Sequence, residues 1–410
     1  MRKLFFLFAL LFLESSCYSP KDINQQIKKD VYVLASDSLE GRRTGTEAEK
    51  KAAEYIAKRF TELKLIPKGP NRYFQNFTFK LSTDPHKEAE FSIIKKEGYL
   101  EGTNVMGFID NQAEQTIVIG AHYDHLGYGG EGSLYRETKL EIHNGADDNA
   151  SGVSLLLHLA ARSKELGKAN NYLFIAFSGE EMGLLGSNYF TKNTTLNKNT
   201  FNYMINMDMV GRLNETNTLA VYGVGSSPLF KQTLSSNNTV FKLVFNDSGI
   251  GPSDHTSFYL IDIPVLHFFT GQHKDYHKPS DDSQYLNYKG MIQISDYIVS
   301  VINDLDNNGK IIFKKTINES EETPRFSVSL GVVPDYLFDG NGMRIDGVSE
   351  GKLAQRIGLK KGDIVIGLDG DSISNMMEYM KALSKHKKGD RSSVTIDRSG
   401  IKETFLITFE

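Results

Sequence analysis

The chain has 410 residues, more than one ordinary domain needs, so we expect two or three domains. Hydrophobic residues make up 40% of the sequence and charged residues 24%, which is typical of a globular protein. The formal charge is −4 and no long basic block is present, which argues against nucleic acid as a partner.

The first 17 residues have the pattern of an export signal. Arg2 and Lys3 precede the apolar run 4–13, which is too short to span a bilayer as a mature helix. Cys17 is the only cysteine, so no internal disulfide can form. It resembles the lipid-attachment cysteine of bacterial lipoproteins, although Glu14 stands where such proteins usually have Leu. We expect an exported protein of a bacterial envelope, held in the periplasm or at the outer membrane by a lipid anchor, or alternatively a secreted protein with an incidental thiol.

Helix and strand patterns alternate from residue 20 to about 310. Apolar residues at helical spacing predict helices at 23–34, 47–63, 153–161 and 290–305. Short runs rich in β-branched and aromatic residues predict strands at 74–81, 91–94, 104–109, 116–121 and 172–177. This alternation is typical of a three-layer α/β sandwich around a mixed, largely parallel sheet.

Acidic and histidine side chains follow the predicted strands, and Asp148 stands on a Gly-flanked turn before the helix at 153–161. Open α/β sheets keep their sites at the carboxyl ends of strands, so we expect these side chains to converge. The turn at 144–152 alone could be only a helix cap. In chain order the candidates are His122, Asp124, Asp148, Glu180, Glu181, Asp208 and His277.

Histidine and carboxylate side chains in such a set suit zinc, which binds imidazole nitrogen and carboxylate oxygen at about 2.0–2.2 Å. Two ions about 3.5–4 Å apart can share a water and stabilise a carbonyl oxygen as it gains charge. The ordered segments resemble the two-zinc aminopeptidase family of exopeptidases, whose relatives include glutaminyl cyclases, over residues 30–305. The resemblance implies a zinc-exopeptidase fold and two Zn²⁺ ions, other divalent ions being possible.

The family pattern implies that His122, Asp148 and Asp208 hold one ion, and that Asp148, Glu181 and His277 hold the other. Asp148, rather than its neighbour Asp147, occupies the position of the family's bridging acid, counted back from Ser151-Gly152.

Glu180 immediately precedes the expected ligand Glu181, and two adjacent residues cannot usually both enter one coordination sphere. Glu180 is therefore free of the metal and is expected to be the general base. The alternative is that Glu180 only caps the helix that follows it. Asp124 is expected to hold the imidazole of His122. His125 is expected to face away from the site.

The segment Ser253 to Phe258 resembles the family's substrate pocket, which makes Asp254 and His255 candidates for that pocket. Four further histidines have no matching role, and His158 is expected to be a hydrogen-bonded core residue. The other three are His143, His267 and His273.

From about Pro324 to Glu410 the sequence resembles a PDZ domain. Its carboxylate-binding loop would be Ser329-Leu330-Gly331-Val332, which could receive the C-terminus of a peptide. The alternative is a PDZ fold that packs on its neighbour and binds nothing.

The sequence therefore predicts a signal sequence at 1–17, a zinc peptidase domain at 20–310 and a PDZ domain at 324–410. The expected activity is removal of the N-terminal residue from peptides with a free N-terminus. The alternatives are a glutaminyl-cyclase-like aminoacyl transferase, and a peptide-binding envelope protein that has lost activity.

Overall fold

The computed structural model describes residues 20–81, 89–92, 96–130, 132–135, 137, 139–316, 328–335, 338, 340–348 and 351–410. Cys17 and the expected export signal lie outside these residues. No helix in the described part of the chain is long and apolar enough to cross a membrane.

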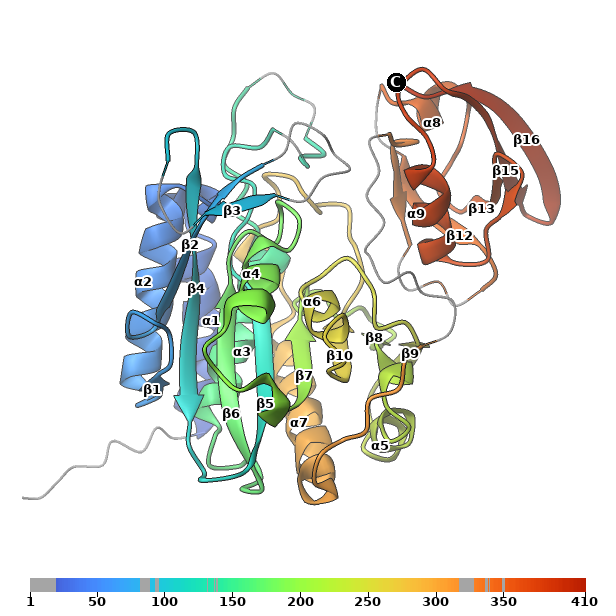
Figure 1. Ribbon diagram of the computed structural model, residues 1–410. Coiled ribbons are helices and arrows are strands. Elements are labelled where there is room, and N and C mark those ends of the chain that lie inside the picture. Colours follow the sequence, from blue (N-terminus) through green and yellow to red (C-terminus); the bar gives the residue numbers. More distant parts are fainter. Residues whose placement is uncertain are drawn as a thin grey trace, which may run out of the picture.

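Residues 20–316 form a three-layer α/β sandwich around one mixed sheet of ten strands (Figure 1). Its four central strands, β6, β5, β7 and β10, run parallel, and the outer pairs are mostly antiparallel. In spatial order the strands are β3 (Glu90–Ser92), β2 (Phe74–Lys80), β4 (Leu100–Ile109), β6 (Asn170–Phe177), β5 (Gln115–His122), β7 (Phe201–Met207), β10 (Val265–Phe269), β8 (Thr218–Tyr222) and β9 (Lys242–Asn246), with β1 (Ile66–Pro67) pairing to β4.

The central strands are buried on both faces, which explains their nearly continuous apolar sequence. In β6, Tyr172 and Phe174 pack into one hydrophobic core, while Leu173 and Ile175 point into a second core on the opposite face. The larger core packs against α1 (Pro20–Leu34), α2 (Glu47–Glu62), α3 (Gly152–Ala161), α5 (Phe230–Ser236) and α7 (Tyr288–Leu305). The smaller core packs against α4 (Leu185–Asn193) and α6 (His255–Tyr259).

The predicted helices and strands are present within the described residues, with small shifts at their ends, while residues 93–94 of the strand predicted at 91–94 lie outside the described residues. The first helix begins at Pro20 rather than Ile23, and the last begins at Tyr288, where Asn287 caps it by accepting a hydrogen bond from the Gly290 amide. His158 on α3 is buried, with Nδ1 2.9 Å from Ser295 Oγ and Nε2 3.0 Å from Asn24 Oδ1. It is the hydrogen-bonded core residue expected from the sequence.

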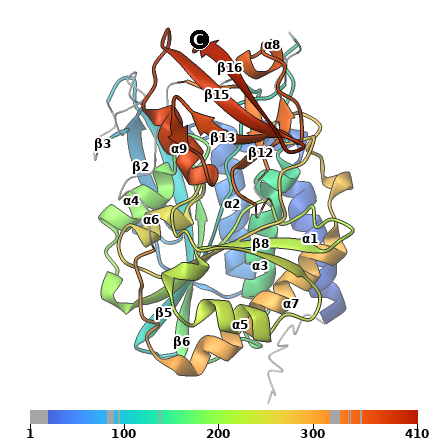
Figure 2. The same ribbon diagram turned by 90° about the vertical axis from the view of Figure 1, so that its right-hand side faces the viewer.

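The C-terminal residues 328–410 form a separate antiparallel sheet with its own core, consistent with a PDZ domain. Figures 1 and 2 both show it next to the end of the large sheet that carries β8 and β9. Its strands are β11 (Val332–Pro334), β12 (Met343–Val348), β13 (Ile364–Leu368), β14 (Asp371–Ser372), β15 (Arg391–Arg398) and β16 (Ile401–Thr408), and its helices are α8 (Leu353–Arg356) and α9 (Met376–Ser384).

The expected carboxylate-binding loop leads into β11, which is an edge strand of this sheet. Leu330 is fully buried, and the Gly331 amide donates a hydrogen bond to Ser329 Oγ at 2.9 Å. Gly331 has a φ of +79°, and a Cβ there would lie 2.2 Å from Cβ of Lys352. The loop therefore requires glycine, both for its conformation and for the close packing of Lys352.

Candidate metal centre

The acidic and histidine side chains lie together beyond the carboxyl ends of the central strands. His122 ends β5, Glu180 and Glu181 follow β6, and Asp208 follows β7. Asp148 reaches the same place from the irregular turn at 146–151, whose preceding residue, Gly145, has a φ of +54°. A Cβ on Gly145 would lie 2.1 Å from the Asp148 carbonyl oxygen, so the turn cannot form around a larger residue.

The two carboxylate oxygens of Asp148 face two different histidines. Its Oδ1 is 3.3 Å from Nε2 of His122, and its Oδ2 is 3.0 Å from Nε2 of His277. The His122 nitrogen is also 3.3 Å from Asp208 Oδ1, and the His277 nitrogen is 3.3 Å from Glu181 Oε2. Asp148 thus stands between two groups of ligand-type atoms, and the five side chains named as metal ligands from the sequence lie together.

The opposite ring nitrogens of both histidines face backbone carbonyls. Nδ1 of His277 is 2.8 Å from the carbonyl oxygen of Gly132, and Nδ1 of His122 is 3.3 Å from that of Asp124. This arrangement favours the proton on Nδ1. Nε2, which faces the carboxylates, is then the unprotonated nitrogen that can bind a metal ion.

His125 belongs to the site, so the expectation that it faces away is wrong. Its Nδ1 lies 2.6 Å from Glu181 Oε1, and its buried Nε2 has no hydrogen-bond partner in the described structure. Strand β5 ends at His122, so the alternation of an extended strand does not apply to His125. His125, Asp148 and Glu181 also form a group of atoms close enough to share an ion. The hydrogen-bond length to Glu181 favours a role in orienting that carboxylate.

The residues present fit zinc. Ligands arranged tetrahedrally at 2.0–2.2 Å from an ion stand about 3.3–3.6 Å apart, close to the 3.0–3.3 Å between donor atoms here. Burial alone would lower the pKa of His122, but the carboxylates of Asp208 and Glu180 raise it well above its ordinary value. Burial is likewise outweighed at His277, where Glu181 and Asp148 raise the pKa. The cluster therefore favours positive charge at both nitrogens, which is what a cation supplies.

Glu180 lies beside this cluster and is farther from His122 Nε2 than Asp148 and Asp208 are. Its Oε2 is 3.9 Å from His122 Nε2, and its amide donates to Asp124 Oδ1 at 3.1 Å. Burial raises its pKa well above the ordinary value, against the effect of His122, and the negative charges of Asp208 and Glu181 raise it further. Its carbonyl accepts from the Gly183 and Leu184 amides, so its backbone also starts the turn before α4.

Asp124 contacts His122 and also holds a neighbouring turn. Its carboxylate Oδ1 is 3.7 Å from Nδ1 of His122, an ion-pair distance, and its carboxylate also accepts hydrogen bonds from the Glu180 amide and, at 3.0 Å, from Thr44 Oγ1. The backbone carbonyl of Asp124 faces the same His122 nitrogen at 3.3 Å. The Asp124 side chain therefore positions the turn that carries Glu180.

Sequence reasoning missed a buried arginine behind the site. Arg42 is 0% exposed, and its guanidinium donates four hydrogen bonds of 2.6–3.0 Å to backbone carbonyls of Leu34, Tyr123, Asn144 and Gly145. Burial lowers its pKa to about 10, despite the nearby charge of Asp148. It ties the turn of Asp148 to the segment after β5. The guanidinium of the neighbouring Arg43 makes one hydrogen bond within the described residues, at 3.3 Å to the Gly129 carbonyl, and nothing in the sequence distinguishes the two arginines.

Two acids hold the turn of Asp148 from the other side. Asp281 Oδ2 accepts hydrogen bonds from the amides of Asp147 and Asp148 at 2.9 and 3.1 Å. Asp147, the neighbour in the turn, accepts from the Gly211 amide at 2.7 Å and lies 3.2 Å from Nε2 of His273. His273 thus has a place beside the site, although no role was assigned to it from the sequence.

A cleft of about 70 Å³ opens over the cluster. The acids of the cluster and His277 line it, and the remaining lining residues are largely apolar or aromatic. These remaining residues are Met209, Tyr222, Pro252, His267, Phe269, Gln272 and Tyr276.

Asp254 and His255 do not line this cleft, which corrects their assignment to the substrate pocket. Both are fully buried behind it, and their loop reaches the cleft through Pro252. The ring of His255 stacks on that of His267 at 4.4 Å, and burial raises the pKa of Asp254 to about 7. The helix α6 starts at His255 and turns both side chains inward.

Comparison with known proteins agrees with this architecture. Residues 104–302 match the sequence model of peptidase family M28, and residues 322–408 match the sequence model of the PDZ domain. Aminopeptidase YwaD of Bacillus subtilis is 23% identical over 318 residues, a match that covers 69% of this chain but only 64%, less than two thirds, of that aminopeptidase.

Solved structures share the fold. A zinc aminopeptidase from Bacillus subtilis superposes with a TM-score of 0.54 at 18% identity, covering 71% of this chain and 98% of the aminopeptidase. Glutaminyl cyclase of Porphyromonas gingivalis superposes with a TM-score of 0.52 at 16% identity, covering 70% of this chain and 99% of the cyclase. The chain therefore contains a peptidase family M28 domain, matched over residues 104–302, and a PDZ domain at its C-terminal end.

Proposed function

We propose that the protein is an aminopeptidase that uses two zinc ions to remove the N-terminal residue from peptides. The observation that carries this proposal is Asp148, whose two oxygens face His122 and His277 separately. His122, Asp148 and Asp208 would hold one ion, and Asp148, Glu181 and His277 the other. When bound, such ions polarise a carbonyl and lower the pKa of a water molecule.

Glu180 acts as the general base in this proposal. Its carboxylate takes a proton from the attacking water and returns it to the amine that leaves. The carboxylate stays available as a base because it lies 3.9 Å from His122 Nε2 and because Asp124 holds the backbone amide of residue 180. Burial raises the pKa of this carboxyl, which favours its holding the proton during transfer.

The cleft suits a peptide with a free N-terminus. The acidic residues of the lining attract the positive amine, and apolar lining residues such as Met209 and Phe269 suit an apolar first side chain. We also propose export through the N-terminal segment, with Cys17 as the anchor. For the PDZ domain we propose the C-terminus of a peptide as ligand of the loop at Ser329–Val332.

A panel of substrates tests the reaction. The zinc-loaded protein should hydrolyse leucyl and methionyl p-nitroanilides, and Nα-acetylation of the same compounds should abolish hydrolysis because the amine is lost. Glutaminyl peptides should be hydrolysed rather than cyclised. Cyclisation of a glutaminyl peptide without hydrolysis of any aminoacyl anilide would show a cyclase instead.

A further inference from the structure

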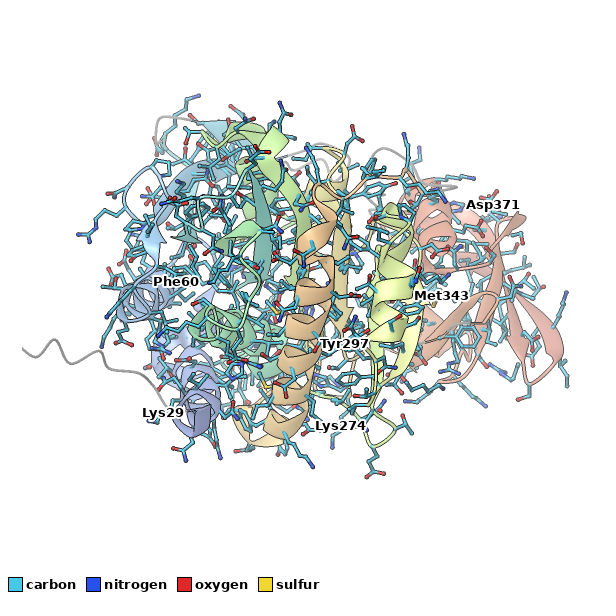
Figure 3. All side chains as sticks on the ribbon, turned by 90° about the horizontal axis from the view of Figure 1, so that it is seen from below. Lys29, Phe60, Lys274, Tyr297, Met343 and Asp371 are labelled. Carbon is cyan, nitrogen blue, oxygen red and sulfur yellow. The ribbon has the colours of Figure 1, made fainter. Side chains whose placement is uncertain are left out.

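A second and larger cavity, of about 310 Å³, lies between the peptidase domain and the PDZ domain. Met343, labelled in Figure 3, lies on the side of the PDZ domain that faces the peptidase domain. The PDZ side of the cavity is formed by Asp335, Phe338, Gly340, Gly342, Met343, Ser374, Asn375 and Met376. The peptidase side is formed by Ala220, Tyr222, Lys231, Val244, Phe245, Asn246 and Asp247.

The cavity adjoins the cleft of the metal centre. Tyr222 lines both, and its ring lies 5.6 Å from that of His267, which also lines the cleft. The space between the domains therefore begins at a residue that also borders the metal centre. The loop Ser329–Val332 is not among the residues that line this space, so the cavity differs from the expected PDZ carboxylate site.

The peptidase wall of the cavity is the edge of the ten-stranded sheet. Strand β9 ends the sheet and pairs only with β8 in the described part of the chain, and four consecutive residues, Val244 to Asp247, line the cavity. Such an edge can pair with an added extended peptide through main-chain hydrogen bonds.

The side chains around the cavity suit a peptide of varied sequence. Apolar groups such as Phe338 and Met376 stand beside polar groups such as Asn246 and Ser374. Charge is mixed, since Lys231 Nζ lies 3.6 Å from Asp247 Oδ1. A lining of this kind gives no preference for a strongly charged ligand, whereas it accommodates a main chain and side chains of several types.

We propose that an extended peptide substrate, with its first residue in the cleft, runs past Tyr222 and pairs with β9 in this cavity. The PDZ domain then forms a wall of the substrate path through Phe338 and the start of α9. This inference rests on the proposed aminopeptidase function, and it predicts that the protein prefers peptides of several residues to single aminoacyl amides.

Binding can be tested without turnover. We would use a fluorescein-labelled decapeptide whose first peptide bond is reduced to a methyleneamine, so that it cannot be hydrolysed, and a dipeptide with the same reduced bond as competitor. Lys231→Trp fills the cavity from an exposed position on α5, where its ion pair with Asp247 contributes little to stability. Lys289→Trp, on the exposed face of α7, is the matched control.

The zinc-loaded full chain should bind the decapeptide at least about tenfold more tightly than the dipeptide, and Lys231→Trp should remove about tenfold of that affinity. Phe338→Ala should act in the same direction, while Lys289→Trp should leave both affinities unchanged. Hydrogen exchange should slow at residues 244–247 when the decapeptide binds.

Equal affinity for the two lengths, or no protection of residues 244–247, would overturn the inference whatever the amide assay gives. Protection confined to residues 329–334 would assign the peptide to the PDZ loop instead and would overturn it as well. If aminoacyl anilides are not hydrolysed but β9 is protected, the proposed reaction fails while the binding site stands.

Discussion

Replacing Glu180 with glutamine separates catalysis from metal binding. The amide has nearly the same shape as the carboxylate, and the backbone amide of residue 180 keeps its hydrogen bond to Asp124. The lost group is a carboxylate 3.9 Å from His122 Nε2, farther than the 3.3 Å of Asp148 and Asp208. Glu180→Gln should therefore keep both ions and lower kcat by about 10²–10⁴-fold, which corresponds to about 3–5 kcal/mol in activation free energy.

The assay measures zinc content and p-nitroanilide hydrolysis on the same preparation. Glu181→Gln is the informative neighbour: it removes a carboxylate 3.3 Å from His277 Nε2, so metal content should fall together with rate. Glu215→Gln, on an exposed turn, controls for the loss of one negative charge. Full activity of Glu180→Gln at full metal content would remove Glu180 from the mechanism. Loss of one ion would make Glu180 a ligand, which its proximity to His122 and Asp208 permits.

Further substitutions test other parts of the account. Asp148→Asn should lower the zinc content at both positions. His277→Ala should remove one ion, whereas His125→Ala should reduce zinc affinity less. If a zinc titration gave the opposite order, His125 rather than His277 would be the ligand. Arg42→Met leaves four buried carbonyls without their hydrogen-bond donor, so it should lower the free energy of unfolding by about 2–5 kcal/mol and weaken zinc binding. Arg43→Met, which removes one hydrogen bond, should change the free energy of unfolding little. Equal effects of the two substitutions in urea unfolding would refute the special role of Arg42. Burial, together with the charge of Arg162, lowers the pKa of His158 from 6.5 to about 4, so between these pH values His158 binds a proton in the unfolded chain but not in the folded one. The free energy of unfolding should therefore fall by up to about 3 kcal/mol as the pH drops from 6.5 to 4. In thermal unfolding, His158→Gln should reduce this dependence on pH, and an unchanged dependence would contradict the prediction. Cys17→Ala should release the protein from membranes or block its maturation, and a mature N-terminus beyond residue 17 without an acyl group would point to simple secretion.

The sequence predicted the fold and the main acids and histidines because these depend on local patterns. Strands such as β6 are apolar throughout, and His122 and Glu180 follow the ends of predicted strands. Asp208 and His277 were assigned through the resemblance to the aminopeptidase family, because no strand was predicted before either of them. Sequence spacing could not place side chains where the chain leaves a strand. His125 turns back toward Glu181 after β5 ends, whereas Asp254 and His255 turn inward at the start of α6.

Long-range contacts were also beyond local patterns. Arg42 reaches carbonyls more than 100 residues away, at Asn144 and Gly145, and its partners are backbone atoms that carry no sequence signal. The cavity beside β9 depends on how two domains meet, which no single segment specifies.

A zinc titration of the purified protein tests the central claim most directly. After treatment with a chelator, the protein should have no activity on leucyl p-nitroanilide, and activity should return as zinc is added, reaching its maximum when two equivalents are bound. Hydrolysis at an unchanged rate in the metal-free protein, or full activity with binding that saturates at one equivalent, would contradict the assignment of Asp148 as the carboxylate shared by two ions.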